Sequence, residues 1–148
     1  MRAVIQRVTK ASVSVKNQLV ADIEKGLVIF LGVIKTDTSA EVDHLAKKIA
    51  ELRIFADHNG KMNLGAKEIN AQLLVVSQFT LCARLAKGRR PSFEPAAEPE
   101  IAEKLYLEFI QHLKNSGLKV KQGIFKAYMT VDIQNDGPVT FILDTKEE

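Results

Sequence analysis

The segment Ser77-Gln78-Phe79-Thr80 combines side chains that could bind or react with a polar ligand. It directly follows an apolar run, residues 73–76, which is typical of a buried strand and would ordinarily end in a Gly, Asn or Pro turn. Hydroxyl and amide groups at the carboxyl end of a central strand are well placed to bind a ligand. A strand edge whose hydroxyls bond to the local backbone explains the same residues equally well.

A second candidate is the basic stretch 87–93, in which Lys87, Arg89 and Arg90 lie close in sequence to Phe93. Cations beside an aromatic ring can neutralise phosphates and stack a base, although a solvated basic loop would have the same composition. The whole chain has 21 Lys and Arg against 18 Asp and Glu, a net charge of +3. That charge permits a nucleic-acid partner without requiring one.

A third segment, Asn135-Asp136-Gly137-Pro138, has the composition of a hairpin turn between two strands. Pro138 removes a backbone donor and restricts the residue before it. X-Pro bonds are cis in only about 5% of cases in folded proteins, so the sequence gives no ground for a cis bond here.

Several common chemistries have no counterpart in the sequence. It contains no Gly-x-Gly-x-x-Gly, P-loop or Gly-x-Ser-x-Gly motif. His44, His58 and His112 are isolated, and the single cysteine, Cys82, has no base nearby in the sequence. We therefore expect surface histidines, a buried thiol and no metal or cofactor. One cysteine allows no intramolecular disulfide and no apolar run reaches ~20 residues, so a cytoplasmic protein is expected.

The elements that must position these residues indicate a single domain over residues 1–148. Strands are predicted over 3–15, 19–23 and 27–34, and a helix over about 39–54, whose N-terminus has capping-box spacing at Thr38 and Glu41. A buried strand at 73–76 and a loop over 83–99 follow.

A second helix is predicted from Pro99 to Gly117, with Ile101, Leu105, Phe109 and Leu113 marking its buried face. Strands are expected over 120–125, 129–133 and 139–143. This order predicts an α/β fold, in which a mixed, mostly antiparallel sheet or partial barrel carries its two helices mainly on one face.

Taken together, these segments resemble the bacterial-type D-aminoacyl-tRNA deacylases across nearly the whole chain. The resemblance rests on collinear motifs: residues 3–8 (Ala-Val-Ile-Gln-Arg-Val), 53–55, 61–63, 77–81 (Ser-Gln-Phe-Thr-Leu), 90–93 (Arg-Pro-Ser-Phe), 123–129 and 135–140 (Asn-Asp-Gly-Pro-Val-Thr). Ser-Gln-Phe-Thr and Gly-Pro in this order are its most specific elements.

The resemblance implies hydrolysis of the ester that joins a D-amino acid, or glycine, to the terminal ribose of tRNA. It also implies a homodimer in which a cis Gly137-Pro138 bond enters the partner's pocket, accepts hydrogen bonds from the substrate ammonium and rejects L-residues. Phe125 and Met129 would pack on the terminal adenine, and Lys87, Arg89 and Arg90 would contact phosphate.

Within this resemblance, Ser77 and Gln78 would orient the terminal nucleotide, and the backbone amides of Phe79 and Thr80 would stabilise the oxyanion. The Thr80 hydroxyl could be a nucleophile but lacks a base, so we favour attack by water assisted by the RNA's 2′-hydroxyl. Two other classes stay open from the residues: a non-catalytic RNA-binding module that uses the basic loop and Phe93, and a structural dimer.

Overall fold

The fold is built around two long strands, β1 (Arg2–Val15) and β8 (Thr130–Asp144), which pair antiparallel along almost their whole length. The computed structural model describes residues 1–86 and 88–147. The sheet has the order β2-β1-β3-β6-β7, with β8 on the other side of β1. Its remaining strands are β2 (Gln18–Ile23), β3 (Gly26–Gly32), β6 (Gln72–Ser77) and β7 (Lys119–Gln122). Only the β3–β6 and β6–β7 pairs are parallel, so the sheet is mixed and mostly antiparallel, as predicted.

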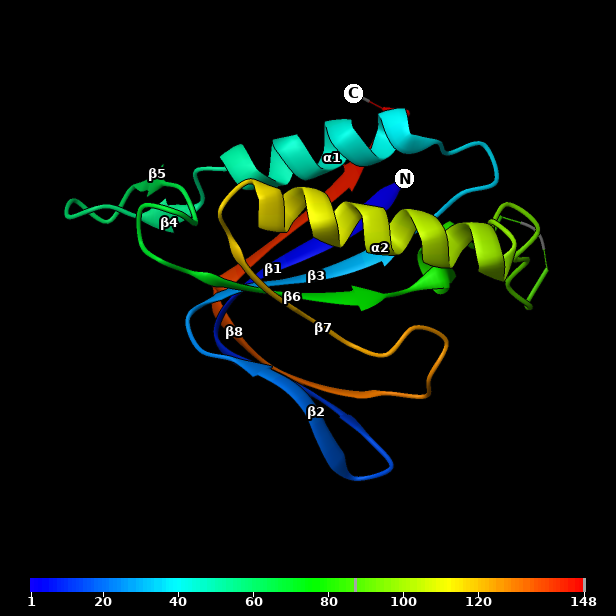
Figure 1. Cartoon of the computed structure of the whole chain (residues 1–148), viewed down its shortest axis with the longest axis horizontal. Coiled ribbons are helices and arrows are strands. Elements are labelled where there is room, and N and C mark those ends of the chain that lie inside the picture. The colour runs from blue at the N-terminus through cyan, green and yellow to red at the C-terminus, as the bar shows by residue number, and fades with distance from the viewer. Residues whose placement is uncertain (87, 148) are drawn as a thin grey trace.

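Both helices, α1 (Ser39–Glu51) and α2 (Pro99–Asn115), lie side by side on one face of the sheet (Figure 1). The capping box at Thr38 and Glu41 starts α1 as predicted, but α1 ends three residues before Ile54. The short strands β4 (Phe55–Ala56) and β5 (Met62–Leu64) form a small hairpin after it. Neither helix has the length and apolar character needed to cross a membrane.

The central strands are buried on both faces, as their continuous apolar runs predicted. On β3, Ile29 packs into the core beneath the helices, whereas the adjacent Val28 packs into a second core on the other face. That second core lies inside the curl of β1, β2 and β8 below the sheet (Figure 1). Lys121 of β7 donates to Asp22 of β2 at 3.1 Å, which links the two edges of the sheet and nearly closes a barrel.

Two expectations for the second half of the chain are wrong. The chain does not reverse at residues 135–138. Strand β8 continues through them and pairs antiparallel with β1 both before and after this segment. Asn135 lies opposite Val8 and Thr140 opposite Gln6, so the intervening residues form an extended bulge rather than a hairpin turn. Ile101 is also 50% exposed, because Ala102 rather than Ile101 continues the buried face of α2 into its first turn and packs against the helix-side core.

Candidate active site

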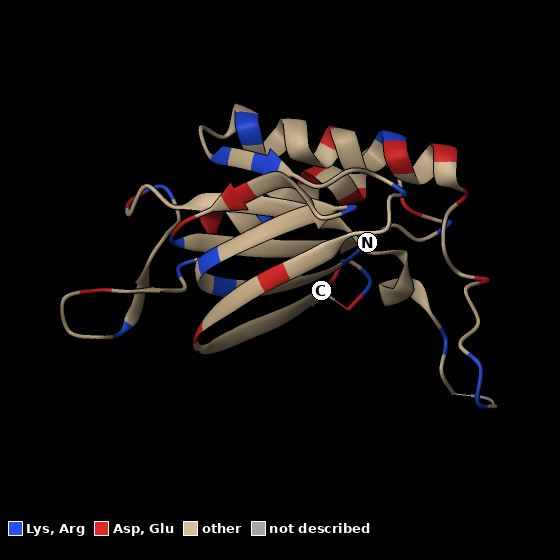
Figure 2. Cartoon of the chain, turned by 90° about the horizontal axis from the view of Figure 1, so that it is seen from below, with Lys and Arg blue, Asp and Glu red and all other residues tan. Residues whose placement is uncertain are grey.

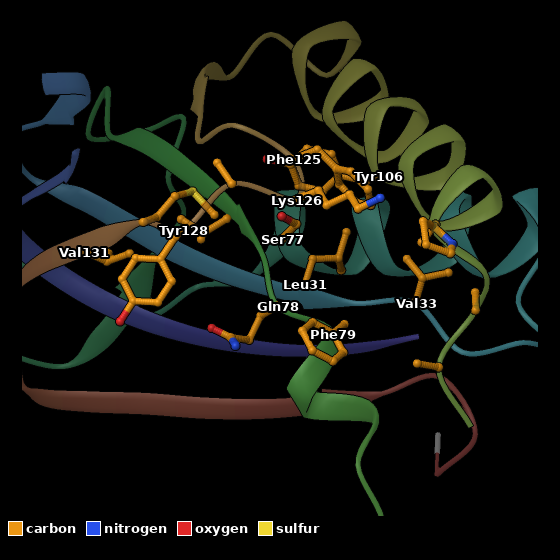
Figure 3. Close-up of a pocket in the computed structure, with 17 residues that line it drawn as sticks. Leu31, Val33, Ser77, Gln78, Phe79, Tyr106, Phe125, Lys126, Tyr128 and Val131 are labelled. Carbon is orange, nitrogen blue, oxygen red and sulfur yellow. The ribbon is translucent and has the colours of Figure 1, made fainter. Parts of the chain in front are cut away.

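A cavity of about 530 Å³ opens where the carboxyl end of β6 meets the first turns of α2 and the β7–β8 connection. Its wall is mostly apolar, with hydroxyl, amide and ammonium groups at a few points, which is the usual composition of a small-molecule site. The lining residues are Leu31, Val33, Val76, Ser77, Gln78, Phe79, Ala96, Ala97, Pro99, Ala102, Tyr106, Phe125, Lys126, Ala127, Tyr128, Met129 and Val131 (Figure 3).

The segment 77–80 leaves β6 and turns at once into a short 3-10 helix, η1 (Phe79–Cys82). The turn is fixed to the neighbouring strand because the Gln78 amide donates to the Leu31 carbonyl at 2.8 Å. Phe79 is 58% exposed at the rim of the cavity. No hydrogen bond recorded among the described residues is donated by the backbone amides of Phe79 or Thr80, since the first amides of a helix lack intrahelical acceptors.

Three of the four predicted residues of the segment 77–80 line the cavity, and the fourth does not. Ser77, Gln78 and Phe79 line the cavity, as expected of a ligand site. The Thr80 side chain is exposed and is not part of the lining; its hydroxyl accepts a hydrogen bond from the Gln78 side-chain amide. Among the described residues, the hydrogen-bond partner of the Thr80 hydroxyl is therefore an amide and not a base.

The opposite wall is anchored at the Val75 carbonyl, which accepts the Tyr106 hydroxyl at 2.9 Å and the Gly123 amide at 3.0 Å. The Tyr106 and Phe125 rings pack with centroids 5.6 Å apart. Burial raises the pKa of Tyr106, so its phenol stays protonated and acts as a donor. Phe125 and Met129 line the cavity, where the sequence analysis expected a terminal base.

No carboxylate or imidazole lines this cavity in the described part of the chain. His112 lies instead between the helices, with its ring 3.3 Å from Asp43, while His44 and His58 are exposed. Cys82 is fully buried, its sulfur donates to the Val33 carbonyl, and burial raises its pKa, so it is not a reactive thiolate. Within the same residues no cluster of His, Cys, Asp or Glu could hold a metal ion.

The Gly137-Pro138 bulge lies midway along β8, next to the row at which β3 and β6 begin. Asn135, beside the bulge, shares a row across the strands with Val8, Gly26 and Gln72, whereas Ser77 lies five residues further along β6. At ~3.3 Å per residue this places Ser77 about 17 Å from the Asn135 row along the strand direction, and β1 and β3 also lie between β8 and β6. One chain therefore does not bring the Gly-Pro segment to its own cavity.

The bulge is nevertheless held in a defined shape. The Gly137-Pro138 peptide bond is cis, and Gly137 has a φ of 121°, which favours glycine. Arg7 forms an ion pair with Asp136 at 3.1 Å and donates to the Ile54 carbonyl at 2.7 Å. The Asn135 side-chain amide closes the bulge by donating to the carbonyls of Arg7 and Val139 at 2.8 and 3.0 Å.

Arg89 and Arg90 of the basic loop do not line the cavity. Arg89 and Arg90 are exposed, and Lys87, the third predicted cation, lies outside the described residues. Sequence reasoning missed Tyr106, Lys126 and Tyr128 as lining residues. Tyr106 carried one usable signal, because a tyrosine on the apolar face of a helix needs a partner for its hydroxyl.

Over the described residues, the fold defines a single-domain α/β protein with a well-formed, mostly apolar cavity at the carboxyl end of a central strand. The family model described as D-Tyr-tRNA(Tyr) deacylase matches residues 4–144, and the chain belongs to this family. A D-aminoacyl-tRNA deacylase of Dictyoglomus turgidum is 56% identical over 99% of this chain and 94% of the relative.

Solved structures agree with this fold. A structure described as c-Myc DNA Unwinding Element Binding Protein is 42% identical, with a TM-score of 0.92 over 98% of this chain and 99% of that one. A second, described as a probable eukaryotic D-amino acid tRNA deacylase, is 16% identical and matches the fold with a TM-score of 0.85 over 96% of this chain and 97% of that one.

Proposed function

We propose that this chain hydrolyses the ester between a D-amino acid and the 3′-terminal ribose of tRNA in the cytoplasm, and that it acts on glycyl-tRNA mischarged on tRNA-Ala as well. Membership of the deacylase family carries the reaction class. The observation that carries the site is the cavity at the end of β6, where the amides of Phe79 and Thr80 begin η1. Ser77, Gln78 and Lys126 add polar groups to a wall that is otherwise largely apolar.

In this proposal the protein catalyses mainly by positioning. Hydrolysis adds water across the ester carbonyl, forms a tetrahedral oxyanion and releases a free amino acid and the ribose hydroxyl. The amides of Phe79 and Thr80 stabilise the oxyanion, while Ser77 and Gln78 orient the nucleotide and Phe125 and Met129 pack on the adenine. Because no carboxylate or imidazole is among the described residues that line the cavity, the RNA's 2′-hydroxyl assists the attacking water.

Chiral selection is assigned to Gly137-Pro138 of a second copy in a homodimer. The supporting observation is the separation of about 17 Å along the sheet, which leaves the bulge unable to reach the cavity of its own chain. Backbone carbonyls of the bulge accept the substrate ammonium, so the side chain of an L-residue would collide with the bulge. Glycine has no side chain to collide and is accepted. Arg89 and Arg90, with Lys87, contact phosphate.

The direct test is hydrolysis of D-Tyr-tRNA and L-Tyr-tRNA. We expect cleavage of the D-substrate only, and equal cleavage of both or of neither would refute the assignment. Thr80→Ala should keep substantial activity, whereas a tRNA ending in 2′-deoxyadenosine should be inert. Complete loss of activity in folded Thr80→Ala would point to a threonine nucleophile instead.

The two-chain site has its own test. If the bulge of one copy completes the site of the other, activity per chain falls when the enzyme is diluted below the concentration at which light scattering shows dissociation. Gly137→Ala should lower the preference for the D-substrate, because a methyl group there would lie 2.8 Å from the Val139 side chain and distort the bulge. A fully active and selective monomer would exclude this arrangement.

A further inference from the structure

Two phenylalanines form an exposed aromatic pair at the rim of the cavity. The rings of Phe79 and Phe93 have centroids 4.9 Å apart and are tilted by 56°. Phe79 is 58% exposed and Phe93 is 38% exposed, although both are large apolar side chains. Clustered exposed apolar groups mark interaction sites more often than isolated ones do. The exposed rings of this aromatic pair are therefore suited to bind a ligand with flat apolar faces.

The backbone holds the aromatic pair in place. Arg84 and Ser92 exchange two hydrogen bonds, of 2.9 and 3.0 Å, which close the base of the basic loop next to Phe93. The Phe93 carbonyl accepts the Ala96 amide at 3.0 Å. Phe79 is held from the other side as the first residue of η1. A platform fixed in this way loses little conformational entropy when a planar group stacks on it.

The surroundings of the aromatic pair carry positive charge. Residues 84–94 include four cations, Arg84, Lys87, Arg89 and Arg90, and one carboxylate, Glu94. Arg84 is 3.3 Å from Glu94, so part of its charge is neutralised, while Arg89 and Arg90 are exposed. The described part of the loop projects from the body of the molecule and carries blue basic positions along its length (Figure 2). Apolar rings beside exposed cations match the two faces of a nucleotide, its base and its phosphate.

We infer that the aromatic pair is a subsite for the unpaired nucleotide that immediately precedes the terminal adenosine of the substrate RNA, with Arg89 and Arg90 facing its phosphate. This inference rests on the proposed function, in which the cavity holds the terminal aminoacyl-adenosine. Phe79 lines the cavity (Figure 3) and is also one of the two rings of the aromatic pair, so a strand that leaves the cavity past Phe79 meets Phe93 next. Stacking tolerates any base, which suits an enzyme that acts on many tRNAs.

The experiment compares two substrates, D-Tyr-tRNA and the minimal ester D-tyrosyl-adenosine, which lacks the preceding nucleotide. Phe93→Ala should raise the KM for the tRNA about 10-fold, the effect expected from losing one stacked base. It should change the KM for the minimal ester by less than twofold. Phe93→Tyr, which keeps a ring, should behave as the wild type. Leu85→Ala is the matched control, because Leu85 is 73% exposed on the same loop and lies outside the aromatic pair.

Equal effects of Phe93→Ala on both substrates, or no effect on the tRNA, would overturn the subsite. Failure of the proposed function looks different, because the wild-type enzyme would then cleave neither substrate. In that case direct binding decides the subsite: a short single-stranded RNA ending in adenosine should bind the wild type about 10-fold more tightly than Phe93→Ala. Equal affinities there would refute the inference independently of catalysis.

Discussion

Gly32, the last residue of β3, leaves the space in which η1 sits. A Cβ at this position would lie 3.0 Å from the Cys82 sulfur, 3.1 Å from the Gln78 carbonyl oxygen and 3.1 Å from the Leu81 Cβ. Two of these groups belong to η1 and the third to its N-cap. Gly32→Ala therefore presses directly on the segment that carries the proposed oxyanion donors.

The expected loss of kcat in Gly32→Ala follows from these three Cβ distances. Ordinary contact for a Cβ begins near 3.4 Å, so the carbonyl of Gln78 must move by about 0.3 Å. A misplacement of ~1 Å can cost about 100-fold in rate, so a shift of this size should lower kcat roughly 3- to 10-fold. Complete loss of one oxyanion donor would cost about 100- to 1000-fold, which sets an upper limit. KM should change little, because most of the cavity wall does not touch Gly32.

The assay is single-turnover cleavage of D-Tyr-tRNA, with the melting temperature followed by circular dichroism. Gly65→Ala is the matched control, since its Cβ would meet the flexible Glu68 carboxylate at 3.3 Å and the Leu52 carbonyl at 3.6 Å, but no atom of η1 within 4 Å. A folded Gly32→Ala with wild-type kcat would refute the reasoning that η1 must be held within tenths of an ångström. A rise in KM alone would show that the segment binds substrate without stabilising the transition state.

Three further predictions concern stability. Asp37→Ala should lower the free energy of unfolding by about 3 kcal/mol in urea titrations, because it removes the carboxylate that accepts a hydrogen bond from the buried Met1 ammonium at 2.8 Å and leaves that charge without its counter-ion. Tyr106→Phe should cost only about 1 kcal/mol by the same measurement, because the Val75 carbonyl keeps a second donor; a loss several times larger would contradict this geometry. Burial acts to raise the pKa of Asp144, but hydrogen bonds from Arg2 and from the Lys146 backbone amide outweigh it and hold the pKa below 3.8. The Asp144 carboxylate therefore stabilises the fold above about pH 4, and this contribution is lost as the pH falls. Asp144→Asn should flatten the acid side of a plot of melting temperature against pH.

Local patterns predicted most of the elements because each depends on residues close together in the sequence. The helix at Thr38 and the buried strand before Ser77 carried capping and apolar signals that tertiary packing did not override. The bulge at residues 135–138 could not be predicted in the same way. Its composition is that of a hairpin turn, and only pairing with β1, more than a hundred residues earlier, decides that the chain continues.

The site was predictable in the part that comes from one segment. Ser77 to Phe79 could be found because polar residues interrupted an apolar run. Lys126 and Tyr128 reach the cavity from the β7–β8 connection, whose course depends on the curl of the whole sheet. Ile101 fits the apolar spacing of α2, but it is 50% exposed because the first turn contacts the core and the cavity through Ala102 instead.

The register of the sheet bears on why this activity would need two chains. β3, β6 and the first half of β1 run side by side, so the end of β6 at Ser77 and the bulge beside Asn135 mark opposite ends of one rigid surface. No loop movement within a chain closes a gap set by five strand residues in a hydrogen-bonded sheet. A second copy related by a twofold axis, however, can bring the bulge of each chain to the cavity of the other. Catalytic donors and chiral selector then reside in different chains, and only the assembled pair of chains would distinguish the two enantiomers.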